Sequence, residues 1–360
     1  AYAMTKAAFD LSERYRIPVL MRLTTRMAHS RAVVEVGEAR AENVSSYPEQ
    51  PRQWVLMPGN SRVRYKTLLE DYARLEEQAA ASPFNTYIDG PNKKLGIIAC
   101  GIAYNYLMET YPDGCPHPVL KIAQYPLPRD LVRRIAAECG TLLILEEGQP
   151  VVEEAVRGVL PNPVTIRGRL TGELPRTGEL SPDSVRTALG MPPRPTQAAS
   201  EVVVARPPAL CQGCGHRDMY HALTEVVREY PSAKVFSDIG CYTLGMVPPL
   251  RAADFLFCMG SSVSAGSGFA MVSDRPVVGF IGDSTFFHSG MTGLANAVFN
   301  KHDVLLVILD NGTTAMTGHQ PNPGVCTSVL GEGCNHLDIE SVVRGIGVTD
   351  VAKVKPFNMR

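Results

Sequence analysis

Two polar residues near the end of the printed sequence have types and spacing that suit a metal–phosphate site. Asp283 follows the apolar run 277–281 after one glycine, and Asn311 follows the apolar run 304–309. If these runs are neighbouring parallel strands, they lie roughly 4.8 Å apart and both side chains project from one edge of the sheet. Carboxylate and amide oxygens beside free backbone N–H groups suit Mg²⁺ with a diphosphate. Two ordinary strand-to-helix turns without a ligand would give the same pattern, so that alternative stays open.

The residues around this pair predict the elements that would position it. Residues 290–300 carry apolar side chains at helical spacing, and Ser289 can serve as the N-cap. Residues 304–309 form an unbroken apolar run, as in a parallel strand buried on both faces. The stretch therefore predicts a strand, a tight loop, a helix and a second strand in a right-handed βαβ unit.

A cysteine- and glycine-rich loop precedes a predicted helix at residues 211–216, with the sequence CQGCGH. Cys211 and Cys214 could be half of a zinc or cluster site, a redox pair, or part of an anion-binding loop at a helix N-terminus. No second CxxC occurs in the sequence, and the thioredoxin-like context of a redox pair is missing. The third interpretation fits best, with Gly213 and Gly215 allowing close approach and His216 adding a donor.

Two further loops of small residues follow. Gly240 and Cys241 come after a short strand at 235–237, and Gly260 and Ser261 open a helix rich in small residues. Both loops could approach a ligand closely. Alternatively, Cys241 is a small buried apolar residue and the glycine–serine stretch serves helix–sheet packing.

Length and composition restrict the class of protein. A chain of 360 residues suggests two or three domains at about 150 residues each. The net charge of -1 and the absence of basic runs give no case for nucleic acid binding. No apolar run approaches the roughly 20 residues that span a membrane, and the start does not resemble a signal peptide. Nine scattered cysteines indicate reduced thiols and a cytoplasmic protein.

The pattern along the chain predicts a multi-domain α/β fold with parallel sheets flanked by helices. A helix and a strand (17–23) in residues 1–40 cannot bury a core, so this segment reads as the remnant of a domain. The chain is therefore expected to be a fragment whose first domain is mostly missing. The remaining segments are a connector at 41–92, a compact α/β domain at 93–160, a Pro-rich linker at 161–208 and a cofactor domain at 209–360, in which a helix at 339–347 and a strand at 351–357 come last.

Three strings carry a family resemblance: GDSTFFHSG at 282–290, ILDN at 308–311 and TAMTGHQPNPG at 314–324. They resemble the thiamine-diphosphate-dependent 2-oxoacid:ferredoxin oxidoreductases, and in particular the alpha subunits of the indolepyruvate branch. The resemblance implies a thiamine-diphosphate-binding fold, with 93–160 as a transketolase C-terminal-like domain and 1–40 as the end of the pyrimidine-binding domain. It implies Mg²⁺ ligation by the side chains of Asp283 and Asn311 and the carbonyl of Thr313. It also implies cofactor contacts from Cys211, Gly213, Cys214, Gly215, His216, Gly240, Cys241, Gly260, Ser261, Gly282, Asp283, Ser284, Asn311, Thr313, Met316 and Thr317.

The function implied by the resemblance is oxidative decarboxylation of arylpyruvates to aryl-acetyl-coenzyme A, with reduction of ferredoxin. The expected partner is a beta subunit in a hetero-oligomer, and the iron–sulfur clusters belong to a C-terminal part beyond these residues. His319 stands where relatives that act on pyruvate carry a glycine, which marks the indolepyruvate branch. His319, His288 and Cys241 are the catalytic candidates, although each histidine could equally hydrogen-bond a loop. The alternatives are another thiamine-diphosphate 2-oxoacid decarboxylase or oxidoreductase, or an inactive cofactor-binding fragment.

Overall fold

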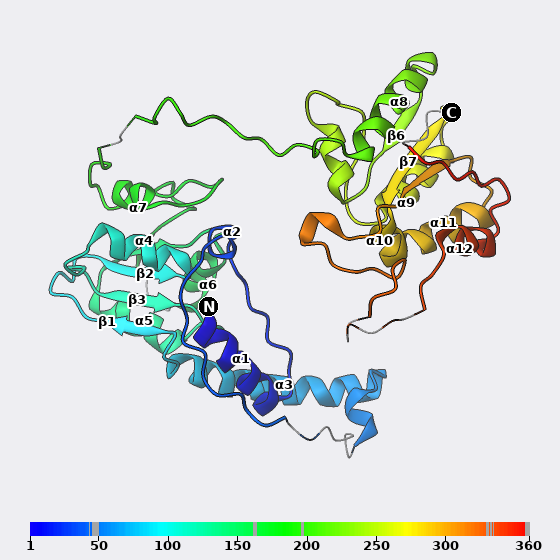
Figure 1. Cartoon of the computed structure of the whole chain (residues 1–360). Helices are drawn as coiled ribbons and strands as arrows, with labels where there is room; N and C mark the ends of the chain where they lie inside the picture. The colour runs from blue at the N-terminus through cyan, green and yellow to red at the C-terminus, as the bar shows by residue number, and fades with distance from the viewer. Residues whose placement is uncertain are drawn as a thin grey trace. The chain divides into compact units, whose positions relative to one another are not determined.

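The computed structural model describes residues 1–42, 44, 50–160, 164–195, 198–328, 331, 333 and 335–356. The chain divides into two compact units, unit 1 (residues 1–198) and unit 2 (residues 199–360), which Figure 1 shows. The division falls inside the stretch 161–208 that composition marks as a linker. Both units contain parallel strands flanked by helices, which confirms the predicted α/β class.

Unit 1 is built on a five-stranded sheet with the strand order β1-β3-β2-β4-β5. Only β1 runs antiparallel to its neighbour, and the other pairings are parallel. The central strands β2 and β4 are buried almost throughout, because helices cover both faces of the sheet. The strands are β1 (Thr86–Ile88), β2 (Gly96–Cys100), β3 (Val119–Ile122), β4 (Thr141–Leu145) and β5 (Thr165–Arg167).

The helices of unit 1 form two apolar cores on opposite faces of this sheet. One core contains Leu107 with Leu180 and Val185, and the other contains Ile135 with Val156. β5 and α7 belong to this unit although they lie in the Pro-rich stretch, because a few apolar residues between the prolines are buried. The helices are α3 (Pro58–Ala80), α4 (Ile102–Thr110), α5 (Arg129–Glu138), α6 (Val151–Val159) and α7 (Pro182–Ala188), the last capped by the side chain of Ser181.

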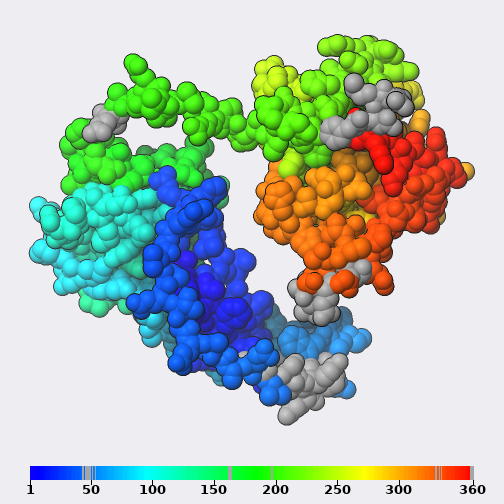
Figure 2. Space-filling model, viewed as in Figure 1, coloured from blue at the N-terminus to red at the C-terminus, as the bar shows by residue number. Residues whose placement is uncertain are grey.

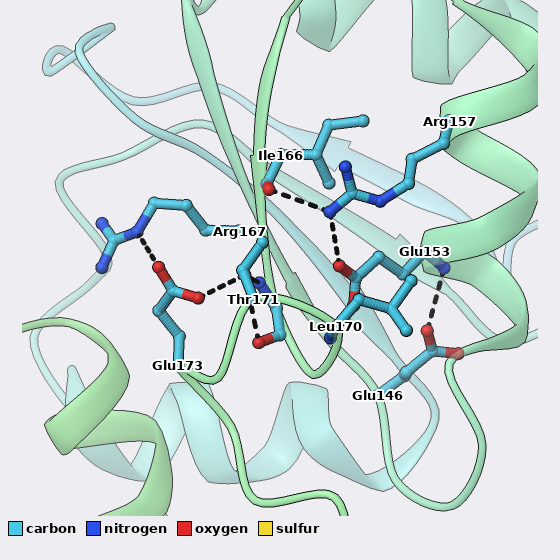
Figure 3. Close-up of polar contacts among 9 residues, drawn as sticks. Glu146, Glu153, Arg157, Ile166, Arg167, Leu170, Thr171 and Glu173 are labelled. Atoms are coloured by element: carbon cyan, nitrogen blue, oxygen red, sulfur yellow. Dashed lines mark hydrogen bonds and ion pairs between the residues drawn. The ribbon is translucent and has the colours of Figure 1, made fainter.

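Two buried glutamates hold the β4–α6 connection together (Figure 3). The Glu146 carboxylate accepts hydrogen bonds from the backbone N–H groups of Val152 and Glu153, both at 2.9 Å, and so caps α6. The Glu153 carboxylate is fully buried and accepts from Arg157 at 2.7 Å and from the N–H of Leu170 at 3.1 Å. Both carboxylates are engaged in hydrogen bonds within unit 1, so we assign them a structural role.

The first 42 residues contribute little to the core of unit 1. α1 (Tyr2–Tyr15) has no buried residue, and Figure 2 shows this segment spread over the surface. Residues 17–23 were predicted as a buried strand, but they form no strand, and Leu20 is 94% exposed. An apolar run becomes a strand only where a neighbour satisfies its backbone groups, and here none does. Two short turns follow, α2 (Thr25–Ala28) and η1 (Pro51–Trp54).

Unit 2 contains a three-stranded parallel sheet in the order β6-β7-β8. Its core includes Ile281, Phe286, Leu294 and Val343. Every helix within the described ranges is too short or too polar to span a bilayer. The elements are α8 (Gly215–Glu229), β6 (Lys234–Phe236), η2 (Cys241–Met246), α9 (Ser261–Ala270), β7 (Val277–Gly282), β8 (Leu305–Leu309) and α12 (Ile339–Ile346).

β8 is not buried on both faces as predicted. It is the edge strand of the described sheet, its residues are half-buried, and Leu305 is 63% exposed. Residues 351–356 were predicted to form a strand, but they form none, and residue 357 lies outside the described residues. An unbroken apolar run shows that a strand is hydrophobic, but it does not show how many elements cover that strand.

The tight loop predicted after β7 is helical instead. α10 (Asp283–Thr285) starts directly at the strand end, continues as the π-helical turn η3 (Phe286–Gly290) and runs into α11 (Met291–Phe299). Ser289 therefore lies within a helix and is not an N-cap. Phe286 and Phe287 are both buried, and burial of these two rings holds the segment against the core instead of leaving it as an exposed loop.

Candidate functional site

Asp283 is a buried carboxylate at the C-terminal end of β7. It is 3% exposed and accepts hydrogen bonds from the Ser284 N–H at 2.8 Å and from Asn322 Nδ2 at 3.0 Å. Burial raises the pKa of the Asp283 carboxyl, and these two hydrogen bonds oppose that rise. Among the described residues, no lysine or arginine forms an ion pair with it. A buried carboxylate without a cationic side chain beside it fits a bound metal ion.

Asn311 lies at the same edge of the sheet. Gly282 pairs with Leu309 in the β7–β8 register, so the residues that follow these two strands emerge together, as the sequence predicts. Asn311 is exposed, and its Oδ1 accepts a hydrogen bond from the Thr313 N–H at 3.2 Å. Within the described residues, no group of three or more His, Cys, Asp or Glu side chains could hold a metal. An ion here would therefore depend on Asp283 together with amide and carbonyl oxygens.

The loop after β8 is tied to the end of β7 at two points. The hydroxyl of Thr314 donates to Ser284 Oγ at 2.8 Å, and Asn322 donates to Asp283. Between these ties the chain turns back through a bridge between Thr314 and Gln320. The short turn η4 (Ala315–Thr317) lies at its tip, where Met316, Thr317 and His319 are exposed. Asn322 is not among the site residues predicted from the sequence, although it lies inside the TAMTGHQPNPG string.

His216 is buried at the start of α8. It is 9% exposed, and its ring meets Tyr242 edge to face with 5.9 Å between the centroids. Gly282, the residue before Asp283, packs against the same tyrosine ring, because a side chain there would come within 2.7 Å of Tyr242. Burial lowers the pKa of His216, whereas the charge of Asp283 raises it. Its Nδ1 is buried and has no partner within the described residues. Buried polar atoms normally have a partner, so this nitrogen fits a ligand oxygen.

The two cysteine loops meet beside this histidine. The hydroxyl of Tyr220 in α8 donates to the carbonyl of Tyr242 in η2 at 2.6 Å, which joins the two segments that carry the loops. Burial raises the pKa of the Cys241 thiol, and charge on Cys214 and Cys211 raises it further. A side chain at Gly240 would come within 2.4 Å of the Tyr242 ring. The predicted loops at 211–216 and 240–241 are therefore neighbours in space, and the glycine allows the aromatic ring to lie against them.

A fully buried carboxylate that the sequence analysis missed holds the next loop. Asp238 accepts hydrogen bonds from the N–H groups of Ile239 (2.8 Å), Gly260 (2.9 Å) and Ser262 (2.9 Å), and from the Ser262 hydroxyl (2.7 Å). The amides of Gly260 and Ser262 at the start of α9 are therefore already bonded to a carboxylate. Gly260 and Ser261 instead line a groove of about 370 Å³ with residues that include Phe257.

The predicted site residues thus fall into two groups. His216, Cys241 and Asp283 gather with their loops at one edge of the sheet, with Ser284 following Asp283. His288 and His319 are exposed, and the structure shows no side-chain hydrogen bond for either of them within the described residues. His319 has a left-handed backbone with a φ of 60°, next to Gly318.

Comparison with known proteins shows which kind of domain unit 2 contains. Residues 238–359 match the family described as thiamine pyrophosphate enzyme, C-terminal TPP binding domain. The indolepyruvate oxidoreductase subunit IorA of Methanothermobacter marburgensis is 42% identical over 98% of this chain, and that of Archaeoglobus fulgidus is 38% identical over 99%. The chain spans about 60% of the length of these relatives. A solved 2-oxoglutarate:ferredoxin oxidoreductase from Magnetococcus marinus matches 42% of this chain and 54% of its own, with 21% identity and a TM-score of 0.35.

The family match assigns residues 238–359 to the thiamine-diphosphate-binding domain that thiamine-diphosphate enzymes carry at their C-terminal end. The similarity to indolepyruvate oxidoreductase subunits IorA extends over nearly the whole of this chain, with identities from 33% to 42%. This confirms the resemblance found in the three sequence strings.

Proposed function

We propose that this chain is part of the alpha subunit of a 2-oxoacid oxidoreductase and that it binds thiamine diphosphate through Mg²⁺. One observation carries the proposal: a buried carboxylate, Asp283, lies near a buried histidine, His216, whose Nδ1 has no partner in the described chain. Asp283, Asn311 and the carbonyl of Thr313 would hold the metal. When bound, the cofactor supplies an electron sink for decarboxylation at a 2-oxo carbon.

The chain itself offers the diphosphate one favourable helix end. In the described part of the chain, the amides of Gly215 and His216 at the start of α8 have no acceptor. Unpaired amides and the helix dipole together attract phosphate. Burial lowers the pKa of His216, which keeps the ring neutral and able to donate one N–H. Metal binding would offset the cost of ionising Asp283, because a cation favours the charged carboxylate.

The proposed substrate is an arylpyruvate, and the proposed partners are coenzyme A, ferredoxin and a beta subunit, with iron–sulfur clusters outside these residues and a cytoplasmic location. The naming of the relatives as indolepyruvate oxidoreductase subunits supports this choice. A thiamine-diphosphate decarboxylase without electron transfer is the second candidate. Reduction of ferredoxin or a viologen dye during substrate turnover separates the two, because a simple decarboxylase would leave the dye oxidised.

Replacing His216 by alanine tests the diphosphate contact. We expect the affinity for thiamine diphosphate at fixed Mg²⁺ to fall about tenfold, because a hydrogen bond to a charged group contributes roughly 1.5 kcal/mol or more. Titration calorimetry measures the change. His221→Ala is the matched control, since this histidine is exposed on the same helix. Equal affinities for the two variants would remove His216 from the site.

Replacing His319 by glycine tests its role in substrate choice. Glycine adopts the left-handed backbone freely, so His319→Gly should stabilise the loop by about 1 kcal/mol. In the complete enzyme we expect the ratio of kcat/KM for indolepyruvate over pyruvate to fall roughly tenfold, as for one lost substrate contact. His319→Ala should lower the ratio equally without the gain in stability. A ratio within about twofold of the natural enzyme would make His319 a loop-packing residue.

A further inference from the structure

Asn322 makes a contact that connects two distant parts of unit 2. It is 7% exposed, and both the nitrogen and the oxygen of its side-chain amide form hydrogen bonds. Nδ2 donates to Asp283 Oδ2 at 3.0 Å, while Oδ1 accepts from the Gly324 N–H at 2.8 Å. The other oxygen of Asp283 accepts from the Ser284 N–H at 2.8 Å. Each oxygen of the carboxylate is therefore held by a donor, and the backbone N–H of Gly312 also favours the charged form of Asp283 and lowers its pKa.

The contact with Gly324 fixes which way the Asn322 amide points. A backbone N–H can only donate, so the amide oxygen must face Gly324 and the NH₂ group must face Asp283. Turning the amide over would put its NH₂ against the Gly324 N–H and its oxygen against the carboxylate, which loses both hydrogen bonds. The two bonds therefore support each other, and together they restrict rotation of the Asp283 carboxylate.

We propose that Asn322 is a positioning residue for Asp283. It holds one carboxylate oxygen so that the remaining lone pairs face the metal, and this role rests on the proposed function of Asp283 as an Mg²⁺ ligand. Residues that hydrogen-bond to metal ligands in this way typically change metal affinity by roughly 10–100-fold when they are replaced. The bond joins residues 39 positions apart, so no local pattern in the sequence announces it.

The same loop provides a control for a purely structural role. Thr314 connects the other end of the loop to Ser284 and forms no hydrogen bond with Asp283. If Asn322 merely closes the loop, loss of either tie should have the same effect. If Asn322 orients the carboxylate, loss of the Asn322 tie should weaken metal binding much more than loss of the Thr314 tie.

The experiment compares the natural protein with Asn322→Leu and Thr314→Val. Electron paramagnetic resonance of Mn²⁺, titrated in the presence of thiamine diphosphate, gives the metal affinity. Hydrogen exchange of residues 312–324 reports loop closure. We expect Asn322→Leu to weaken Mn²⁺ binding by at least tenfold and Thr314→Val to stay within twofold, with lower loop protection in both. Asn322→Ser is the milder variant and carries the test if the leucine variant does not fold.

Two results would overturn the inference. Equal losses of Mn²⁺ affinity in the two variants, or an Asn322 variant within twofold of the natural protein, would show that Asn322 only closes the loop. A natural protein that binds no Mn²⁺ in the presence of thiamine diphosphate would instead overturn the proposed function, and the inference with it. The measurement on the natural protein therefore distinguishes a failure of the inference about Asn322 from a failure of the proposed function.

Discussion

Mg²⁺-dependent binding of thiamine diphosphate should be lost when Asp283 is replaced by alanine. We expect the affinity to fall by well over 100-fold, because changes outside the ligand shell already cost roughly 10–100-fold and a direct ligand should cost more. Asp283 is a buried carboxylate at this edge of the sheet, whereas the other candidate ligands are an exposed amide and a backbone carbonyl. Calorimetric titration at fixed Mg²⁺ measures the loss. An unchanged affinity would exclude Asp283 from the site.

Asp283→Asn adds a stability measurement to this test. Burial raises the pKa of Asp283 above the ordinary value of 3.8. The folded protein therefore binds this proton more tightly than the unfolded chain does. The resulting stabilisation is fully present below pH 3.8 and is lost as the pH rises through the raised pKa of Asp283. The asparagine variant carries no such cost of ionisation, but its NH₂ group faces one of the two donors and loses that hydrogen bond. At pH 7 without metal we therefore expect its stability to lie within about 1 kcal/mol of the natural protein. Thermal unfolding in a chelator checks this, and a large loss of stability would indicate a structural role for the carboxylate.

Replacing Asp238 by alanine should destabilise unit 2 by roughly 3–5 kcal/mol. The change leaves the N–H groups of Ile239, Gly260 and Ser262 without their acceptor, and each unsatisfied buried donor costs about 1–3 kcal/mol. Hydrogen exchange of peptides that cover residues 238–262 measures the effect on unit 2 by itself, which matters because a chain of two units need not unfold in one step.

Ser262→Ala is the matched control for this prediction. It removes one hydroxyl donor, leaves the backbone donors and the carboxylate in place, and should cost about 1 kcal/mol. If Asp238→Ala costs no more than this control, water takes the place of the carboxylate and Asp238 does not hold the loop.

The sequence predicted those parts of the site that follow from local patterns. Apolar runs located β7 and β8, and chain continuity then placed Asp283 and Asn311 at one edge, which the strand register confirms. A glycine-rich loop before a periodic helix likewise located His216 at the start of α8. In each case, about ten consecutive residues are enough to recognise the strand or helix that positions the site residue.

The sequence did not predict the contacts that hold the site in place. Asp238 and Asn322 act on residues 22 or more positions away, so neither periodicity nor a turn signal reveals them. The helical start at Asp283 also escaped prediction, because a Gly-Asp-Ser string reads as a turn until the burial of Phe286 and Phe287 is known. Local rules locate the ends of strands, whereas tertiary packing decides what stabilises them.

The carboxylate of Asp238 also has a consequence for the direction in which a ligand approaches. By occupying the first amides of α9, the protein places its own negative charge where a phosphate would otherwise find donors. The start of α8 has no such internal anion among its described contacts. If a diphosphate binds at this edge as proposed, it would meet attraction at the start of α8 and repulsion at the start of α9. This asymmetry would select one end-to-end orientation of a ligand that is charged at one end, before any contact with its reactive ring.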